Sequence, residues 1–203
     1  PHINQIIDDV IENRFSEIEL TYFVSGCYTK GLSMKESAAL TKAIVSTGSQ
    51  LKFKRKVVFD KHCAGGVPNN RTTMIVVPIL AAMGYTIPKT SSRAITSAAG
   101  TADTMEVLAP VSLSKEKIMD VVNKVGACIV WGGSVGLAAA DDLLIRVRHP
   151  LRLDPEGMLL ASIMAKKKAV GATHVLIDLP YGYEAKFATI AKAKKLGQKF
   201  IEL

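Results

Sequence analysis

The segment KHCAGG at residues 61–66 is the first stretch whose residue types could do chemistry. It follows a short apolar run, and Lys61 supplies a full positive charge. The paired glycines Gly65 and Gly66 let backbone N–H groups approach an anion closely. A helix expected to start nearby favours negative charge at its N-terminus. The pattern predicts a phosphate cradle, although it lacks the spacing of a Walker loop. The alternative is an ordinary glycine turn with a surface lysine.

A second segment, residues 89–103, carries six hydroxyl side chains, Arg93 and one glycine, with almost no bulky side chain. Hydroxyls can donate to phosphate oxygens and accept from ribose. A Ser/Thr linker would have a similar composition. This segment contains no proline and is followed by apolar residues, so a binding loop is the favoured interpretation.

A third group combines Arg146, Arg148 and Arg152 with Ser162 and Lys166. If residues 155–170 form a helix, Ser162 and Lys166 stand four apart and share a face. Such a set could hold carbonyl oxygens or a developing anion. On the residues alone, a solvated, lysine-rich helix end is the simpler reading.

Two further residues could move a proton. His62 sits beside the cradle, where a nearby phosphate would raise its pKa and help it act as an acid. Asp154, followed by proline, is a helix N-cap first and a catalytic acid second. Asp141 and Asp142 could hold a cation, but helix capping is favoured. The histidines show no metal-ligand spacing; they are His2, His62, His149 and His174.

Composition places this chemistry in a folded chain. The 203 residues are 48% apolar and 22% charged, which predicts one or two globular domains. The net charge of +8 favours anionic partners. A single Trp makes a stacking platform for single-stranded nucleic acid unexpected. The odd cysteine count, with no close pair, argues against a disulfide framework or zinc knuckle and favours a reducing, cytoplasmic setting. No membrane span or signal peptide is expected, and the chain opens with Pro1, so its natural start is expected to lie upstream.

The elements that must position these residues alternate in type. Residues 1–48 read as helices, with capping boxes at Ser16-x-x-Glu19 and Ser33-x-x-Glu36 and C-cap glycines at Gly26 and Gly48. Strands are expected at 56–60, 86–90 and 127–131, and a buried strand at 174–178. Helices are expected from a cap at Thr72 or Thr73 to Gly84, at 114–126, across 137–169 and at 189–203.

This order predicts an α/β fold, with a small, split all-α domain and a parallel sheet domain joined by crossover helices. The predicted divisions are 1–50 (helical), 51–136 (α/β), 137–170 (helical, continued) and 171–203 (α/β, continued). The last helix would lack a following strand, so the fold is expected to be truncated at its C-terminus. The cleft between the two parts is a natural ligand site.

Three stretches together resemble the thymidine and pyrimidine-nucleoside phosphorylase family, including its AMP phosphorylase branch. They are DKHCAGGV at 60–67, SSRAITSAAGTADTMEVLAPV at 91–111 and DPEGMLLASIMAKKKAVGATHVLID at 154–178. The resemblance implies a pentosyltransferase that uses phosphate to split a nucleoside into free base and pentose 1-phosphate. It implies no metal or organic cofactor, since inorganic phosphate is a co-substrate, and a homodimer formed through the helical domain.

The resemblance also implies residue roles. His62 and Asp154 would be catalytic, with Asp154 as proton donor in the AMP phosphorylase branch. Phosphate would be bound by Lys61, Cys63, Gly65, Gly66, Thr73, Ser91 and Thr101. The nucleoside or nucleotide would be bound by Ser92, Arg93, Ala94, Ile95, Thr96, Ser97, Arg148, Ser162, Lys166 and Lys186.

The sequence departs from the family at Cys63, where Ser is usual; a thiol is a weaker donor, so weaker phosphate binding is expected. Pyrimidine nucleosides are the leading substrates, and nucleoside 5′-monophosphates are the alternative. An anthranilate phosphoribosyltransferase-like enzyme is less favoured, because its GTGGD motif is broken at 63–67. A noncatalytic nucleotide or nucleic-acid binder remains compatible with the net charge.

Overall fold

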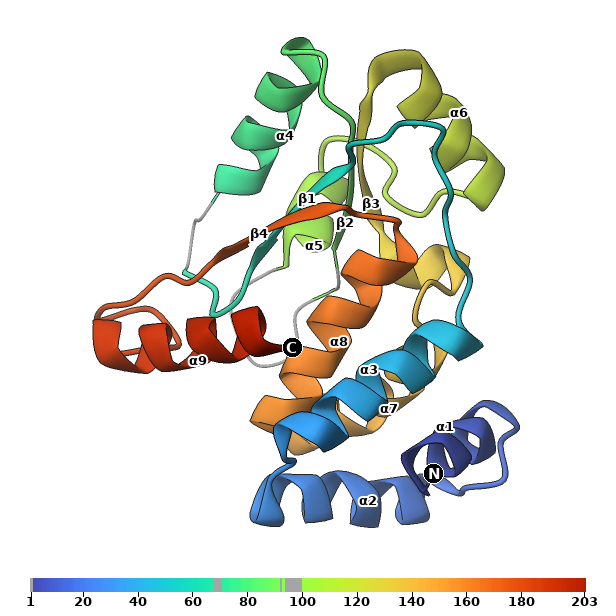
Figure 1. Ribbon diagram of the computed structural model, residues 1–203, viewed down its shortest axis with the longest axis vertical. Helices are drawn as coiled ribbons and strands as arrows, with labels where there is room; N and C mark the ends of the chain where they lie inside the picture. The colour runs from blue at the N-terminus through green and yellow to red at the C-terminus, as the bar shows by residue number, and fades with distance from the viewer. Residues whose placement is uncertain (1, 68–70, 92, 94–99) are drawn as a thin grey trace.

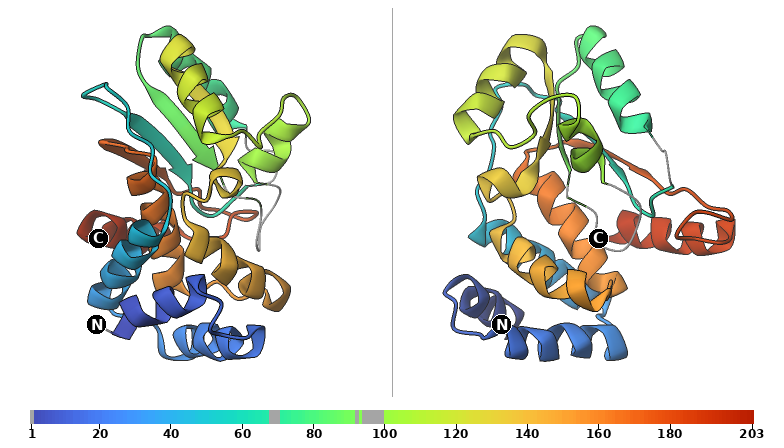
Figure 2. Two further views of the ribbon diagram at one scale, coloured as in Figure 1. Left: turned by 90° about the vertical axis from the view of Figure 1, so that its right-hand side faces the viewer. Right: turned by 180° about the vertical axis from the view of Figure 1, so that it is seen from behind.

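The computed structural model describes residues 2–67, 71–91, 93 and 100–203. One end of the molecule consists of helices, the other holds the strands with further helices around them, and α8 (Glu156–Ala169) runs from the helical end to the sheet (Figures 1 and 2). The predicted α/β class, with a split helical part and parallel strands, is confirmed. In the described part of the chain, no helix has the length and apolar character needed to cross a membrane.

The helical part unites two stretches that are far apart in sequence. The helices α1 (His2–Ile11), α2 (Glu17–Lys30) and α3 (Met34–Thr47) pack against α7 (Ala139–Leu151) and α8 around one apolar cluster. Small residues permit close approach: a Cβ added at Gly157 would lie 2.6 Å from Leu32. The interior of this part therefore depends on both stretches.

The local signals for these helices are mostly correct. Both capping boxes form, with Ser16 and Ser33 as N-caps. Gly48 is the C-cap of α3, as predicted. The prediction for Gly26 is wrong: α2 continues through it to Lys30, and Gly31 is the C-cap, with a positive φ of 77° that glycine adopts readily.

Four parallel strands carry the sheet. Strand β1 (Phe59–Cys63) pairs with β4 (His174–Asp178), and β2 (Ile87–Ser91) pairs with β3 (Ala127–Trp131). The two pairs adjoin, because the Phe59 N–H donates to the Thr86 carbonyl at 2.8 Å. Their arrowheads point the same way in Figure 1. The carboxyl ends of the strands thus share one edge, where open parallel sheets place ligands.

Two strand predictions need correction. The first strand is predicted at 56–60, but β1 begins at Phe59 and ends at Cys63. Pairing with β4 satisfies the backbone of the later residues, so the charged start of the KHCAGG motif lies on a strand. The strand at 174–178 is predicted to be buried. Its first three residues are exposed, because β4 pairs only with β1 among the described strands.

Helices flank the strands. They are α4 (Thr72–Ala82), α5 (Thr101–Glu106), α6 (Lys115–Val125) and α9 (Ile190–Glu202). The helix expected over 114–126 forms as α6, with Ser114 as its N-cap and Gly126 as its C-cap. The cap predicted at Thr72 or Thr73 is wrong: both residues lie inside α4, and the N-cap Arg71 makes no side-chain capping bond.

Candidate functional site

A group of buried cations lies where the carboxyl ends of β1 and β2 meet α8. Lys61 and Lys89 come from the strands, and Lys166 and Lys167 from α8; each is at most 4% exposed. Arg148, on α7, is fully buried. Burying charged groups is costly unless each is paired or hydrogen-bonded, so their partners decide what the site can hold.

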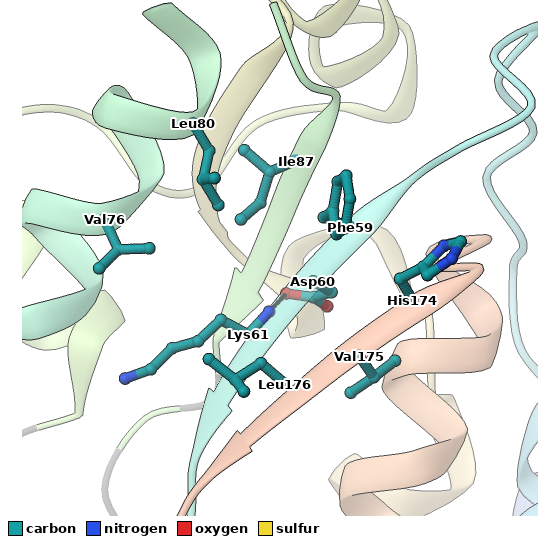
Figure 3. Close-up of a pocket in the computed structure, with 9 residues that line it drawn as sticks. All are labelled: Phe59, Asp60, Lys61, Val76, Leu80, Ile87, His174, Val175 and Leu176. Carbon is teal, nitrogen blue, oxygen red and sulfur yellow. Dashed lines mark hydrogen bonds between the residues drawn. The ribbon is translucent and has the colours of Figure 1, made fainter. Parts of the chain in front are cut away.

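Lys61 is fixed by two partners from other elements. Its Nζ lies 2.9 Å from Asp178 Oδ2, at the end of β4, and 3.4 Å from Thr73 Oγ1, in the first turn of α4. Figure 3 shows its side chain extending from β1 toward α4. Thr73 therefore lies beside Lys61, as the predicted phosphate site requires, although it is not a helix cap.

A cavity of about 280 Å³ adjoins Lys61 on this face of the sheet. Apart from Asp60 and Lys61 its lining is largely apolar, with Val76, Leu80 and Ile87 on one side (Figure 3). Asp60 Oδ1 accepts the backbone N–H of Lys61 at 2.7 Å. A largely apolar lining does not suit a dianion, so this cavity does not fit the predicted phosphate site.

Asp60 also pairs with Lys167 across the fold. The Asp60 carboxylate accepts from Lys167 Nζ, and both side chains are at most 2% exposed. Lys167 further donates to the Thr90 carbonyl at 3.4 Å, and Lys89 donates to the same carbonyl. This contact connects α8 to both central strands.

Ser162 and Lys166 meet over one carboxylate, as the helical spacing predicts for a shared face. Asp141 Oδ2 accepts from Ser162 Oγ at 2.6 Å and from Lys166 Nζ, which also lies 3.1 Å from Ser162 Oγ. The expectation of a solvated lysine end is wrong here, because Lys166 is 4% exposed. The prediction that Asp141 caps a helix is also wrong, because its buried carboxylate binds the ammonium group of Lys166.

Asp154 lies beside this group. Its carboxylate accepts from Arg148 and from Lys186, and α8 begins two residues later, with no side-chain cap. The predicted N-cap role is therefore wrong. Arg148 Nη1 also lies 3.9 Å from Asp141 Oδ1, while its Nε and Nη1 have no hydrogen-bond partner among the residues that the structure describes. Arg148 is fully buried, so these unpartnered N–H groups are costly unless an acceptor meets them.

The glycine loop adjoins Lys186. The Lys186 N–H donates to the Gly65 carbonyl at 2.9 Å. Gly65 has a φ of 117°, and a Cβ there would lie 2.8 Å from the Phe187 ring. Only glycine fits this position comfortably. The loop is thus held by the segment that follows β4, and Gly66 also has a positive φ, of 36°.

His62 and Cys63 complete the end of β1. Burial is the main cause that lowers the pKa of His62 well below its usual range, and the neighbouring lysines lower it further. With these groups around it the imidazole is neutral near pH 7, and the rise in its pKa expected from a bound phosphate stays a prediction. Burial and the nearby Asp178 raise the pKa of the Cys63 thiol to about 11. Cys63 thus acts as a neutral thiol.

The hydroxyl-rich segment is only partly described. Ser91 ends β2 and is 7% exposed, and Thr101 begins α5. Arg93 pairs with Asp103 and Glu106, and its guanidinium stacks over Trp131, at 4.9 Å from the ring centroid. The Arg93 guanidinium is therefore already bound by nearby protein groups. The remaining predicted residues lie outside the described part: Ser92, Ala94, Ile95, Thr96 and Ser97.

The described site holds more cations than carboxylates. The cations Lys61, Lys89, Lys166, Lys167, Arg148 and Lys186 face the carboxylates Asp60, Asp141, Asp154 and Asp178. An anion would balance the surplus.

Sequence reasoning missed four of these residues, namely Lys89, Lys167, Asp60 and Asp178. For Lys89, Asp60 and Asp178 the available signal was a charged residue inside a strand, because such charges are buried only with partners. Lys167 lies in a lysine run on α8 and carried no such signal. Among the described residues, no three His, Cys, Asp and Glu side chains gather as a metal site needs.

Comparison with known proteins identifies the class. Residues 55–180 match the glycosyl transferase family, a/b domain, and the chain belongs to this family. It is 55% identical over 200 residues to "Putative thymidine phosphorylase 1" of Acidovorax sp. strain JS42, covering 98% of this chain and 39% of that protein. It is 51% identical to AMP phosphorylase of Thermofilum pendens, covering 99% and 39%. The resemblance drawn from the three motifs is thereby confirmed.

A solved structure supports the fold. Anthranilate phosphoribosyltransferase from Thermus thermophilus superposes with a TM-score of 0.69, covering 96% of this chain and 58% of that one, at 18% sequence identity. This likeness concerns architecture alone. The chain spans about two fifths of the length of the two phosphorylases it matches.

Proposed function

We propose that this chain forms the phosphate- and base-binding part of a pentosyltransferase that cleaves pyrimidine nucleosides with phosphate. The observation that carries the proposal is the surplus of buried cations at the carboxyl edge of the sheet. Such a surplus is expensive in an empty site and is balanced by a dianion. The names of the related proteins agree with this chemistry.

In the proposed reaction, a phosphate oxygen attacks the anomeric carbon of the sugar. The new C–O bond forms as the C–N bond to the base breaks, and that electron pair leaves with the base. Lys61 holds the phosphate together with N–H groups of the Gly65–Gly66 turn. Holding the attacking oxygen in line reduces the entropic part of the barrier. The remaining phosphate ligands in the proposal are Cys63, Thr73, Ser91 and Thr101.

Arg148, Ser162 and Lys166 hold the base. As the base leaves, negative charge develops on its ring, and donors already in place stabilise that charge; one such donor contributes about 3–4 kcal/mol in known sites. The unpartnered N–H groups of Arg148 support this role.

A proton must also reach the departing base. His62 and Asp154 are the two candidates. Asp154 is paired with two cations, an arrangement that suits a positioning carboxylate better than a proton donor. His62 is neutral before phosphate binds and carries one N–H. We therefore favour His62 as the donor, with the bound dianion favouring its protonated form.

A second substrate class, nucleoside 5′-monophosphates, is favoured by one observation. Lys186 adds a cation beside Asp154, next to the glycine loop, and is 30% exposed. A 5′-phosphate is one group it could meet. In the same proposal the enzyme is cytoplasmic, needs no metal or organic cofactor, and pairs as a homodimer through the helical part. Exposed apolar residues on α2, Ile18 and Tyr22, suit such an interface.

The test supplies the protein with phosphate and either thymidine, uridine, AMP or CMP, and measures released base. Phosphate-dependent release from thymidine or uridine is expected, and Lys61→Met is expected to abolish it. Release from AMP or CMP alone would select the second substrate class. Magnesium-dependent use of an activated pentose diphosphate, or salt-sensitive nucleic-acid binding without turnover, would overturn the proposal.

A further inference from the structure

Lys89 differs from every other buried lysine of the site. It lies in the middle of β2 and is 2% exposed. Lys61, Lys166 and Lys167 each pair with a carboxylate. The Nζ of Lys89 instead donates to the Thr90 carbonyl, and no carboxylate of the described residues lies within ion-pair distance of it. A buried ammonium with no counter-charge calls for an explanation.

The strand register places Lys89 beside Lys61. The hydrogen bond from the Phe59 N–H to the Thr86 carbonyl sets Phe59 next to Ile87, and both line the same cavity. Side chains on one face of a strand recur every second residue. Lys61 and Lys89 are therefore lateral neighbours on one face.

The next pair on this face, at the strand ends, is Cys63 and Ser91. Both belong to the proposed phosphate site. Lys89 thus lies directly behind two proposed phosphate ligands and beside a third, Lys61, all on the face that meets α4.

We propose that Lys89 is a further phosphate-binding residue, whose ammonium group and that of Lys61 together hold the dianion. The inference rests on the proposed function, since it assumes that phosphate occupies the strand ends. The titratable groups that interact electrostatically with Lys89 are Lys167, Asp60, Lys61, Cys63, His62 and Cys128. Asp60 is already bound to Lys167, so a counter-charge for protonated Lys89 would come from a ligand.

The protonation of Lys89 gives this proposal a distinctive consequence. Burial, with Lys167 and Lys61 nearby, lowers its pKa to about 7. Above that pH the amine is mostly neutral while the site is empty. A bound dianion favours the charged form, so binding must draw a proton from solution. The pKa of His62 starts well below 6.5, lower than that of Lys89, so at alkaline pH we expect Lys89 to take up the proton.

The experiment is calorimetric titration of the chain with inorganic phosphate at about pH 8.5, in two buffers of different ionisation enthalpy. At this pH free phosphate is already mostly a dianion. We expect the unchanged chain to take up close to one proton per bound phosphate. Lys89→Met should lose that uptake and bind phosphate about 10- to 100-fold more weakly, the range for one hydrogen bond to a charged group. The same substitution at an exposed position, Lys115→Met, should retain both.

Three outcomes decide the matter. Phosphate binding without proton uptake by the unchanged chain, or equal affinity of K89M and the unchanged chain, would overturn the role of Lys89 and leave the proposed function standing. No phosphate binding by the unchanged chain would overturn both. If circular dichroism shows K89M to be unfolded, the proton count of the unchanged chain decides alone.

Discussion

Replacing Asp60 by Asn tests how the buried charges hold the two halves of the fold together. The amide oxygen introduced by Asp60→Asn could still accept the Lys61 N–H, which Asp60 Oδ1 accepts at 2.7 Å. The substitution therefore removes the charge opposite Lys167 and little else. Both side chains of this pair are at most 2% exposed. Removing one partner of such a pair typically costs about 3–5 kcal/mol of unfolding free energy, because it strands the other charge.

The cost of deprotonating Lys167 sets an independent upper limit on the free energy lost in Asp60→Asn. A lysine with an ordinary pKa can give up its proton at pH 7 for about 4–5 kcal/mol, at about 1.36 kcal/mol per pH unit. The loss caused by Asp60→Asn cannot much exceed that cost, since Lys167 can become neutral instead. The two arguments agree on a loss of about 3–5 kcal/mol.

The assay is urea unfolding at pH 7, followed by circular dichroism, with a matched surface control. Asp120 and Lys124 form an exposed i,i+4 pair on α6 at 3.1 Å. Asp120→Asn should cost no more than about 0.5 kcal/mol. Asp60→Asn combined with Lys167→Met should recover part of the loss. A loss below about 1 kcal/mol of unfolding free energy for Asp60→Asn alone would refute the argument that this pair is shielded from water and that each charge depends on the other.

Three other predictions concern single positions. Burial raises the pKa of Asp142 to about 6, so the stability that its protonated form contributes is complete below about pH 4 and is lost as the pH rises through 6. Asp142→Asn should therefore raise the melting temperature more at pH 8 than at pH 4. Equal effects at the two pH values would contradict this. Gly65→Ala, with φ at 117° and the Phe187 ring 2.8 Å away, should cost about 1–3 kcal/mol in urea unfolding; a neutral result would mean that the loop relaxes freely. The thiol of Cys63, with its pKa raised to about 11, should react with iodoacetamide at pH 8 at least about tenfold more slowly than free cysteine, and comparable rates would contradict the burial argument.

Local signals in the sequence carried much of the fold. The two Ser-x-x-Glu boxes, the helix over 114–126 and the strand at 127–131 depend on near neighbours, and each forms as expected. The errors arose where distant residues decide. Gly26 has no local reason to continue a helix, yet α2 runs past it. Asp154 has a typical capping context, yet Arg148 and Lys186 bind its carboxylate.

The site could be predicted in its parts but not in its pairing. The lysine–glycine motif and the Ser162–Lys166 spacing predicted anion binding, and the structure places Ser162 and Lys166 on one carboxylate, as a shared helix face requires. Nothing local indicates that Asp141 binds Lys166 from 25 residues away, or that Asp60 binds Lys167 from 107 residues away. Those contacts exist only after the strands and α8 have been assembled.

Lys166 and Lys167 are adjacent in sequence, yet one binds Asp141 of α7 and the other binds Asp60 of β1. Successive side chains on a helix point about 100° apart, so a single turn of α8 makes ion pairs with both the helical part and the sheet. Inserting or deleting one residue ahead of this turn would rotate both ammonium groups away from their aspartates together. The positions of the proposed base site and the proposed anion site therefore both depend on this turn of α8, and a shift of the turn would displace both.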